Sequence, residues 1–349
     1  LKPDCTEAYI NLGTVLKGLG KLQEAESYLR KAIVLNPNLS NSHYLLASIL
    51  INLNKPLDAE VSLRKSIELN PDCSESYYML GNIYKNNEKL EESKKYLLKA
   101  IEIKPHWKTY YIYASCLFEE NELALAKQNI LKAIDENNKS FNNYKSLKDE
   151  KEKNILDAAL KAINSAKNKE NILNNQDFER TIINMPVDKE LLSYLYTLNK
   201  EKLNNMKDAR YGDGLCSNYK LFEDQSDIIS KLEKDIKEIC KKVIGVKEMI
   251  IRDSFFNIFK SGSGLNKHNH IGEYDSHFGL GSYKYVLVYY LEKGDQSSKE
   301  PGILKLYNPE QSITPINGMI VIVKANTLHS VSYDGNKDRV IVGVNFYGF

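Results

Sequence analysis

The sequence predicts a multidomain protein, with a helical repeat array at the N-terminus and a β-sandwich or jelly roll at the C-terminus. The first observation is a proline that recurs every 34 residues, at Pro3, Pro37, Pro71 and Pro105. The second is a series of short apolar runs between glycine and proline turns after Met249, a pattern typical of short strands. The expected domains are residues 1–138, a helical connector at 139–205, and the β-rich domain at 206–349.

The composition is that of an ordinary soluble globular protein. Of its 349 residues, 42% are hydrophobic and 27% are charged, and the formal net charge is only +2. This balance gives no strong bulk attraction to nucleic acid or membrane, so we expect neither as a partner. No apolar run approaches the roughly 18 residues of a membrane-spanning helix. Because the chain begins at Leu1 instead of Met, we expect it to be part of a longer protein.

The five cysteines indicate a reducing compartment. They lie far apart, are odd in number and show no Cys-x-x-Cys spacing. We therefore expect free thiols and a cytoplasmic location.

Other positions keep the period of the prolines. Small residues recur at Gly13, Ala47 and Gly81, and the same spacing relates the sets Ala25, Ala59, Ser93 and Ala32, Ser66, Ala100. With the Asn-Pro pairs at 36–37 and 70–71, this pattern resembles the tetratricopeptide repeat, and a degenerate fourth copy covers residues 107–138. The resemblance implies stacked helix pairs whose concave surface binds a peptide or protein.

The connector and the start of the last domain also read as helical. Residues 145–174 alternate acids and bases around Ile155, Leu156 and Ile163, which predicts a charged amphipathic helix that caps the repeats. Further helices are expected around 189–196 and at 224–242, the latter packed on a sheet. The first strand is expected at 249–259, followed by a turn at 262–264. The alternating run 283–291 predicts a second strand.

Three histidines in the last 85 residues could hold a metal ion. Residues i and i+2 of a strand point to one face, so His268 and His270 could present two imidazoles to one ion if this segment is extended. His329, from another strand, would be the third ligand and leave up to three positions of an octahedral first-row metal open. Arg339 lies ten positions later, and its guanidinium suits a bidentate pair with a carboxylate.

In this order, these residues resemble a family. From Phe255 to the end the chain is similar to the double-stranded β-helix (jelly-roll) core of iron(II)- and 2-oxoglutarate-dependent oxygenases, of the prolyl-hydroxylase-like type and its bacterial branch. The resemblance implies a hydroxylase with Fe(II) and 2-oxoglutarate as cofactors and ascorbate as an optional third. It assigns His268, His270 and His329 to the metal, and Arg339 to the distal carboxylate of 2-oxoglutarate. Tyr290 and Leu304 are lesser candidates for lining the co-substrate.

One departure from the family pattern leaves alternatives open. The second ligand is usually a carboxylate, whereas here it is His270, so Asp275, Glu273 or His277 could be the second ligand instead. A three-histidine, cupin-like dioxygenase that works without 2-oxoglutarate would explain the missing carboxylate but would leave Arg339 without a role. A non-catalytic repeat scaffold with a degenerate oxygenase domain is the third alternative.

Overall fold

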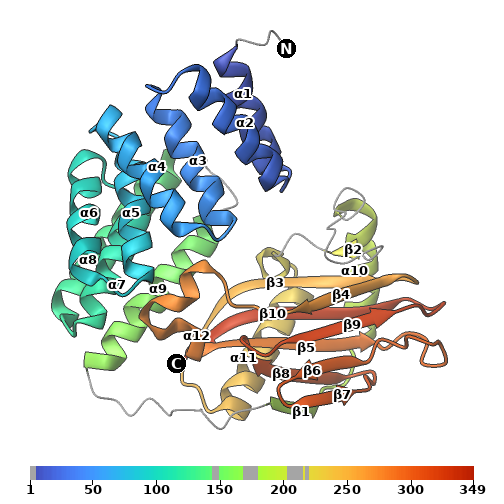
Figure 1. Ribbon diagram of the computed structural model, residues 1–349. Helices are drawn as coiled ribbons and strands as arrows, with labels where there is room; N and C mark the ends of the chain where they lie inside the picture. Colours follow the sequence, from blue (N-terminus) through green and yellow to red (C-terminus); the bar gives the residue numbers. More distant parts are fainter. Residues whose placement is uncertain (1–4, 144–148, 168–179, 203–214, 217–219) are drawn as a thin grey trace. The chain divides into compact units, whose positions relative to one another are not determined.

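The structure is a computed structural model that describes residues 5–143, 149–167, 180–202, 215–216 and 220–349 (Figure 1). The chain divides into two compact units, Leu1–Ser146 and Leu147–Phe349. Within the described ranges, no helix combines the length and the apolar character needed to cross a membrane. Cys5, Cys73, Cys116 and Cys240 are free thiols.

The described part of the N-terminal unit is helical. Consecutive helices pack in pairs, α1 with α2, α3 with α4, α5 with α6 and α7 with α8 (Figure 1). Their bounds are α1 Thr6–Gly18, α2 Leu22–Leu35, α3 Ser40–Asn52, α4 Pro56–Leu69, α5 Ser74–Asn86, α6 Leu90–Ile103, α7 Trp107–Glu119 and α8 Leu123–Asn143.

Small side chains let the paired helices approach each other. The repeat positions that the sequence predicted to be small are fully buried in all four helix pairs, where a larger side chain would force the backbones apart. These residues are Ala25, Ala32, Ala59, Ser66, Ser93, Ala100, Ala126 and Ala133, each 0% exposed. The packing therefore confirms the helical solenoid that the 34-residue period predicted.

Asparagine and proline end the second helix of a repeat. α2 stops before Asn36, whose side-chain oxygen accepts a hydrogen bond from the Asn38 backbone N–H at 3.2 Å. After α4, the Asn70 side-chain oxygen likewise accepts a hydrogen bond from the Asp72 backbone N–H at 3.1 Å. The following proline lacks the N–H that a further helical turn would need.

The described part of the C-terminal unit is built on two antiparallel sheets. The first sheet has the strand order β1-β8-β5-β10-β3-β2 and the second has β4-β9-β6-β7. From β3 onward the chain alternates between them, with β3, β5, β8 and β10 in the first sheet and β4, β6, β7 and β9 in the second. The strand bounds are β1 Arg180–Asn184, β2 Leu215–Cys216, β3 Met249–Phe259, β4 Ser263–His268, β5 Lys284–Glu292, β6 Leu304–Tyr307, β7 Glu310–Ile313, β8 Met319–Lys324, β9 His329–Tyr333 and β10 Arg339–Gly348.

Helices accompany these sheets. Their bounds are α9 Asp149–Lys167, α10 Lys189–Lys202, α11 Asp227–Ile244 and α12 Leu280–Tyr283, with 3-10 helices η3 Leu221–Glu223 and η4 Glu273–Gly279. α9 packs on β3, η4 and α12.

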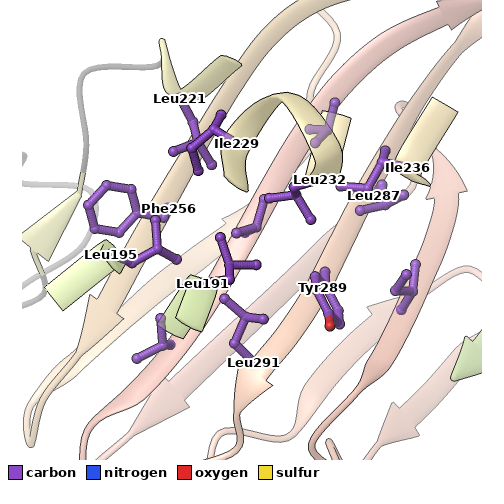
Figure 2. Close-up of a cluster of buried hydrophobic side chains, with 14 of the residues drawn as sticks. Leu191, Leu195, Leu221, Ile229, Leu232, Ile236, Phe256, Leu287, Tyr289 and Leu291 are labelled. Atoms are coloured by element: carbon purple, nitrogen blue, oxygen red, sulfur yellow. The ribbon is translucent and has the colours of Figure 1, made fainter. Parts of the chain in front are cut away.

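Alternation along the strands of the six-stranded sheet produces two separate cores. One face packs against α10 and α11, and Figure 2 shows Leu191 of α10 and Ile229 of α11 among the side chains of this core. The opposite face carries Phe259, Tyr290 and Ile341, which cluster with Leu304 of the second sheet. The second core, between the sheets, is the one that borders the candidate site.

One strand differs from the expected organisation. Residues 139–205 were expected to be a helical connector, but Arg180–Asn184 forms β1 and pairs with β8 at the edge of the first sheet. Five residues with an alternating exposed and half-buried pattern give a weak sequence signal in a polar stretch.

Close helix packing in the third repeat can be tested at Gly81. A Cβ there would lie 2.6 Å from Leu97 Cγ, whereas a Cβ on Gly18 meets nothing within 4 Å. Gly81→Val should therefore lower the free energy of unfolding by about 1–3 kcal/mol through overpacking, and Gly18→Val serves as the control. Trp107, the single tryptophan, is 3% exposed in α7 and reports urea unfolding of the solenoid by fluorescence. Equal midpoints for the two variants would contradict this packing.

Candidate metal centre

The three histidines predicted as ligands come together at one end of the second sheet. His268 is the last residue of β4 and lies directly opposite His329, the first residue of β9. His270 follows two residues later, beyond the end of β4. The expectation that both His268 and His270 lie on one strand is thus met only for His268, although all three imidazoles still converge.

The distances fit a single ion. His270 Nε2 and His329 Nε2 are 3.3 Å apart, and the candidate ligand atoms of all three histidines lie within 4.8 Å of one another. At a metal–nitrogen distance of about 2.1 Å, two ligands at right angles are separated by about 3 Å. In the described part of the chain this is the one such group of three histidine, cysteine or acidic residues.

Backbone carbonyls fix which nitrogen faces the centre. His268 Nδ1 donates to the Asn266 carbonyl at 2.7 Å, and His329 Nδ1 donates to the Thr327 carbonyl at 3.0 Å. Since a carbonyl can only accept, Nδ1 carries the proton and Nε2 keeps its lone pair. This arrangement is the usual support behind a metal-binding histidine.

Burial keeps His329 neutral. The side chain is 6% exposed, and desolvation lowers its pKa to about 4, opposed by the bond to Thr327. A neutral imidazole is the form that binds a metal, so this ligand needs no deprotonation near pH 7. His268 and His270 are only half-buried, which leaves the centre accessible from one side.

The alternative second ligands lie outside the histidine group. Asp275 is 1% exposed and its carboxylate is bonded to the Lys284 ammonium at 2.7 Å and to the Tyr347 hydroxyl at 2.6 Å. His277 is buried and is likewise not part of the group. The Glu273 side chain falls outside the described residues.

Arg339 is buried beside the core between the sheets. It is 1% exposed at the start of β10, and its guanidinium carbon lies 4.9 Å from the Tyr290 ring centroid and 6.0 Å from that of Tyr333. Nη1 donates to the Gly302 carbonyl, and any Cβ at Gly302, whose φ is +79°, would overlap the guanidinium. Leu304 is 5% exposed in the same core.

The positive charge of Arg339 lacks a counterion among the described residues. Its Nε has no hydrogen-bond partner. The side chains that stabilise the charged guanidinium are tyrosines, and no described carboxylate contributes. Desolvation lowers the pKa of the guanidinium, and Tyr290 raises it. A buried cation without an anion is costly, so this position is a candidate anion-binding site.

Polar residues that the sequence analysis did not single out lie on the same face of the first sheet. Asn257 of β3 is 2% exposed, and neither its amide oxygen nor its amide nitrogen has a hydrogen-bond partner. The Asn345 side-chain oxygen, on β10, is also unpartnered. For Asn345, a polar residue inside a largely apolar strand was the available signal.

Comparison with known proteins identifies the repeats. Models described as tetratricopeptide repeat match residues 6–39, 40–73 and 74–106. The N-terminal unit therefore contains tetratricopeptide repeats, and α7 and α8 add a helix pair beyond the matched segments. No curated protein matches the chain.

Several solved structures share limited similarity with the chain. A crystal structure of MamA is 24% identical, has a TM-score of 0.38 and covers 40% of this chain and 82% of its own. Pseudomonas aeruginosa pilF is 21% identical, with a TM-score of 0.39, and covers 47% and 69%. YrrB, described as a TPR protein with an unusual peptide-binding site, is 19% identical, with a TM-score of 0.36, and covers 39% and 70%.

The histidine group makes a direct prediction about metal binding. His329→Ala removes the most buried ligand and should abolish stoichiometric binding of Fe(II) or Co(II), while the far-UV circular dichroism stays unchanged. His43→Ala, at a half-buried histidine of the solenoid, is the control. Metal analysis after gel filtration decides the outcome, and undiminished metal content in His329→Ala would exclude this site.

The depressed pKa of His329 predicts a pH dependence of stability in EDTA. The unfolded chain takes up this proton near pH 6.5, whereas the folded protein does so only near pH 4. The contribution of the neutral imidazole to the free energy of unfolding is therefore fully present above pH 6.5. It is lost as the pH falls to about 4, and the loss is on the order of 3 kcal/mol. Calorimetry of wild type and His329→Gln at pH 7 and pH 4.5 should show a smaller loss in the variant, and identical losses would contradict the assignment.

Proposed function

We propose that the C-terminal unit is a jelly-roll dioxygenase that uses Fe(II) and 2-oxoglutarate to hydroxylate a substrate recruited by the repeats. The observation that carries the proposal is the combination of two features in one unit. Three imidazoles converge with lone pairs available for a metal, and Arg339 is a buried cation that no described carboxylate neutralises.

The strand order supports the jelly-roll assignment. A jelly roll is a pair of antiparallel sheets formed by eight strands that cross from one sheet to the other. β3 to β10 follow this course, with β6 and β7 as the one hairpin that stays within a sheet. β1 and β2 then extend the first sheet at its two edges.

The ligand set fits Fe(II). Imidazole suits first-row metals including iron, and three ligands on one side of an octahedron leave open positions for a chelating co-substrate and dioxygen. The triad is neutral because the usual carboxylate is replaced by His270. Bound Fe(II) and 2-oxoglutarate would supply oxidation by dioxygen, coupled to decarboxylation of 2-oxoglutarate to succinate.

The environment of Arg339 fits a carboxylate. His329 and Tyr333 lie four residues apart on β9, so their side chains point to the same face of the strand. The Tyr333 ring centroid in turn lies 6.0 Å from the Arg339 guanidinium carbon, which supports the proposal that the guanidinium and the histidine group border the same core between the sheets. A dicarboxylate could therefore bind the metal through one end and pair with Arg339 through the other.

Each residue then has a defined task. His268, His270 and His329 hold the ion through Nε2, and the carbonyls of Asn266 and Thr327 keep two of these rings oriented. Arg339 fixes the distal carboxylate of the co-substrate, so that its reactive end faces the metal. The rings of Phe259, Tyr290 and Tyr333 surround the guanidinium and exclude water, which strengthens the ion pair.

The repeats give the proposal its substrate class. Tetratricopeptide solenoids present concave surfaces suited to peptides and proteins. Tethering such a surface to a catalytic unit raises the local concentration of the bound chain at the metal. We therefore assign a peptide or protein as the substrate.

The three-histidine ligand set also favours a second candidate, a cupin-like dioxygenase that does not use 2-oxoglutarate. The two candidate functions differ in the role that they assign to Arg339. In the second, a buried and unpaired arginine has no function, whereas in the first it is the co-substrate anchor. Dioxygen consumption with and without 2-oxoglutarate separates them.

Substitution of Arg339 tests the co-substrate site. Arg339→Met removes the guanidinium that would form a bidentate ion pair with a carboxylate. The 2-oxoglutarate concentration for half-maximal succinate formation should therefore rise about 100-fold or more. Fe(II) binding should persist, and stability should not fall, because the variant removes an unpaired buried charge. Arg339→Lys should be partly active, since lysine offers a point charge in place of a fork.

The control for this test is the metal-free His329→Ala variant, which should form no succinate at any 2-oxoglutarate concentration. An unchanged 2-oxoglutarate requirement in Arg339→Met would refute the anchor. Oxygen consumption by the wild type that ignores 2-oxoglutarate would instead favour the cupin-like alternative.

A further inference from the structure

His270 is the one member of the histidine group that lies outside the strands. β4 ends at His268, so the antiparallel ladder that fixes His268 and His329 does not extend to His270. Both polar groups of its peptide are nevertheless bonded to the first sheet. Its N–H donates to the Ala325 carbonyl at 2.8 Å, and its carbonyl accepts from the Lys284 ammonium.

The position of the Lys284 ammonium is fixed in turn by an ion pair with Asp275. The lysine is 2% exposed, and its ammonium also donates to Asp275 Oδ2 at 2.7 Å. The same carboxylate accepts from the Gly272 backbone N–H and, through Oδ1, from the Tyr347 hydroxyl at 2.6 Å. Without Asp275 the buried ammonium would lose the carboxylate that it is bonded to, and it would no longer be held against the His270 carbonyl.

The loop that carries His270 is thus attached to β3, β5 and β10 through one carboxylate, because Asp275 Oδ2 also lies 3.5 Å from Arg252 Nη1 of β3. Gly272 lies on the same loop as His270, Asp275 lies in η4 directly after that loop, Lys284 opens β5, and Tyr347 lies near the end of β10. Charge-assisted hydrogen bonds are shorter and stronger than neutral ones, so this attachment is well suited to fix a segment without regular structure.

We propose that the Asp275–Lys284 ion pair is a positioning device that holds the His270 ligand in place for the metal. The inference rests on the proposed metal site and assigns Asp275 a role behind a ligand in place of a role as a ligand. The Asp275 carboxylate therefore acts on the metal through the His270 backbone. Residues that support a metal ligand in this way typically contribute 10- to 100-fold to metal affinity.

The test is a titration of the metal-free protein with Co(II), followed by its visible absorption. Lys284→Met and Asp275→Asn should each weaken Co(II) binding by about 10- to 100-fold and alter the absorption spectrum, because His270 is misplaced. Tyr347→Phe removes only one bond to Asp275 and should cause a smaller loss. If the charge variants do not fold, Tyr347→Phe carries the test.

Matched controls separate positioning from general destabilisation. Lys85→Met breaks another buried lysine ion pair, with Glu119 in the solenoid, and Tyr289→Phe removes a buried hydroxyl on the opposite face of the first sheet. Both should bind Co(II) as the wild type does.

A double-mutant cycle shows whether Asp275 acts through His270. In a His270→Ala background the remaining two histidines bind Co(II) more weakly, and Asp275→Asn should then have no further effect. An equal effect in both backgrounds, or wild-type affinity and spectrum in the folded Lys284→Met and Asp275→Asn variants, would overturn the inference. Failure of the wild type to bind Co(II) would overturn the metal site itself.

Discussion

Arg339 imposes the main constraint on the C-terminal unit. A guanidinium that is 1% exposed must be compensated, yet the described residues offer it one carbonyl and aromatic rings but no carboxylate. Aromatic contacts stabilise a cation by only about 1–2 kcal/mol, less than the several kcal/mol that desolvation costs. Gly302 shows how closely the surroundings are fitted to this side chain, since no other residue leaves room for the guanidinium. In the proposed function a bound carboxylate would complete the arrangement and link the core between the sheets to the candidate metal centre.

The candidate metal centre combines two kinds of support. His268 and His329 face each other across a strand pair, so the pairing of β4 with β9, which shifts register between Leu265 and His268, sets the distance between them. His270 lies in a loop, where individual side-chain bonds replace the ladder. In a neutral triad no ligand carboxylate attracts the ion, so affinity depends strongly on how well the three Nε2 atoms are placed.

Much of this architecture could be predicted from the sequence, because periodic patterns report burial directly. The 34-residue period placed the residues that are fully buried between helices, and the strands expected at 249–259 and 283–291 correspond to β3 and β5. The three histidines were found through their spacing, although His270 reaches the group from a loop. β1 was missed because a five-residue edge strand has little periodicity to detect. The partners of Asp275 could not be predicted, since the distance along the chain to Lys284 and Tyr347 does not show that the three side chains meet in space.

The most direct test of the account is an anaerobic titration of the Fe(II)-loaded protein with 2-oxoglutarate, followed by visible absorption. If the three histidines and Arg339 form one site, a charge-transfer band should appear as the co-substrate chelates the metal, with one equivalent bound per chain. The same band should require far more 2-oxoglutarate in Arg339→Met. A spectrum of the wild type that does not respond to 2-oxoglutarate, despite bound Fe(II), would contradict the account.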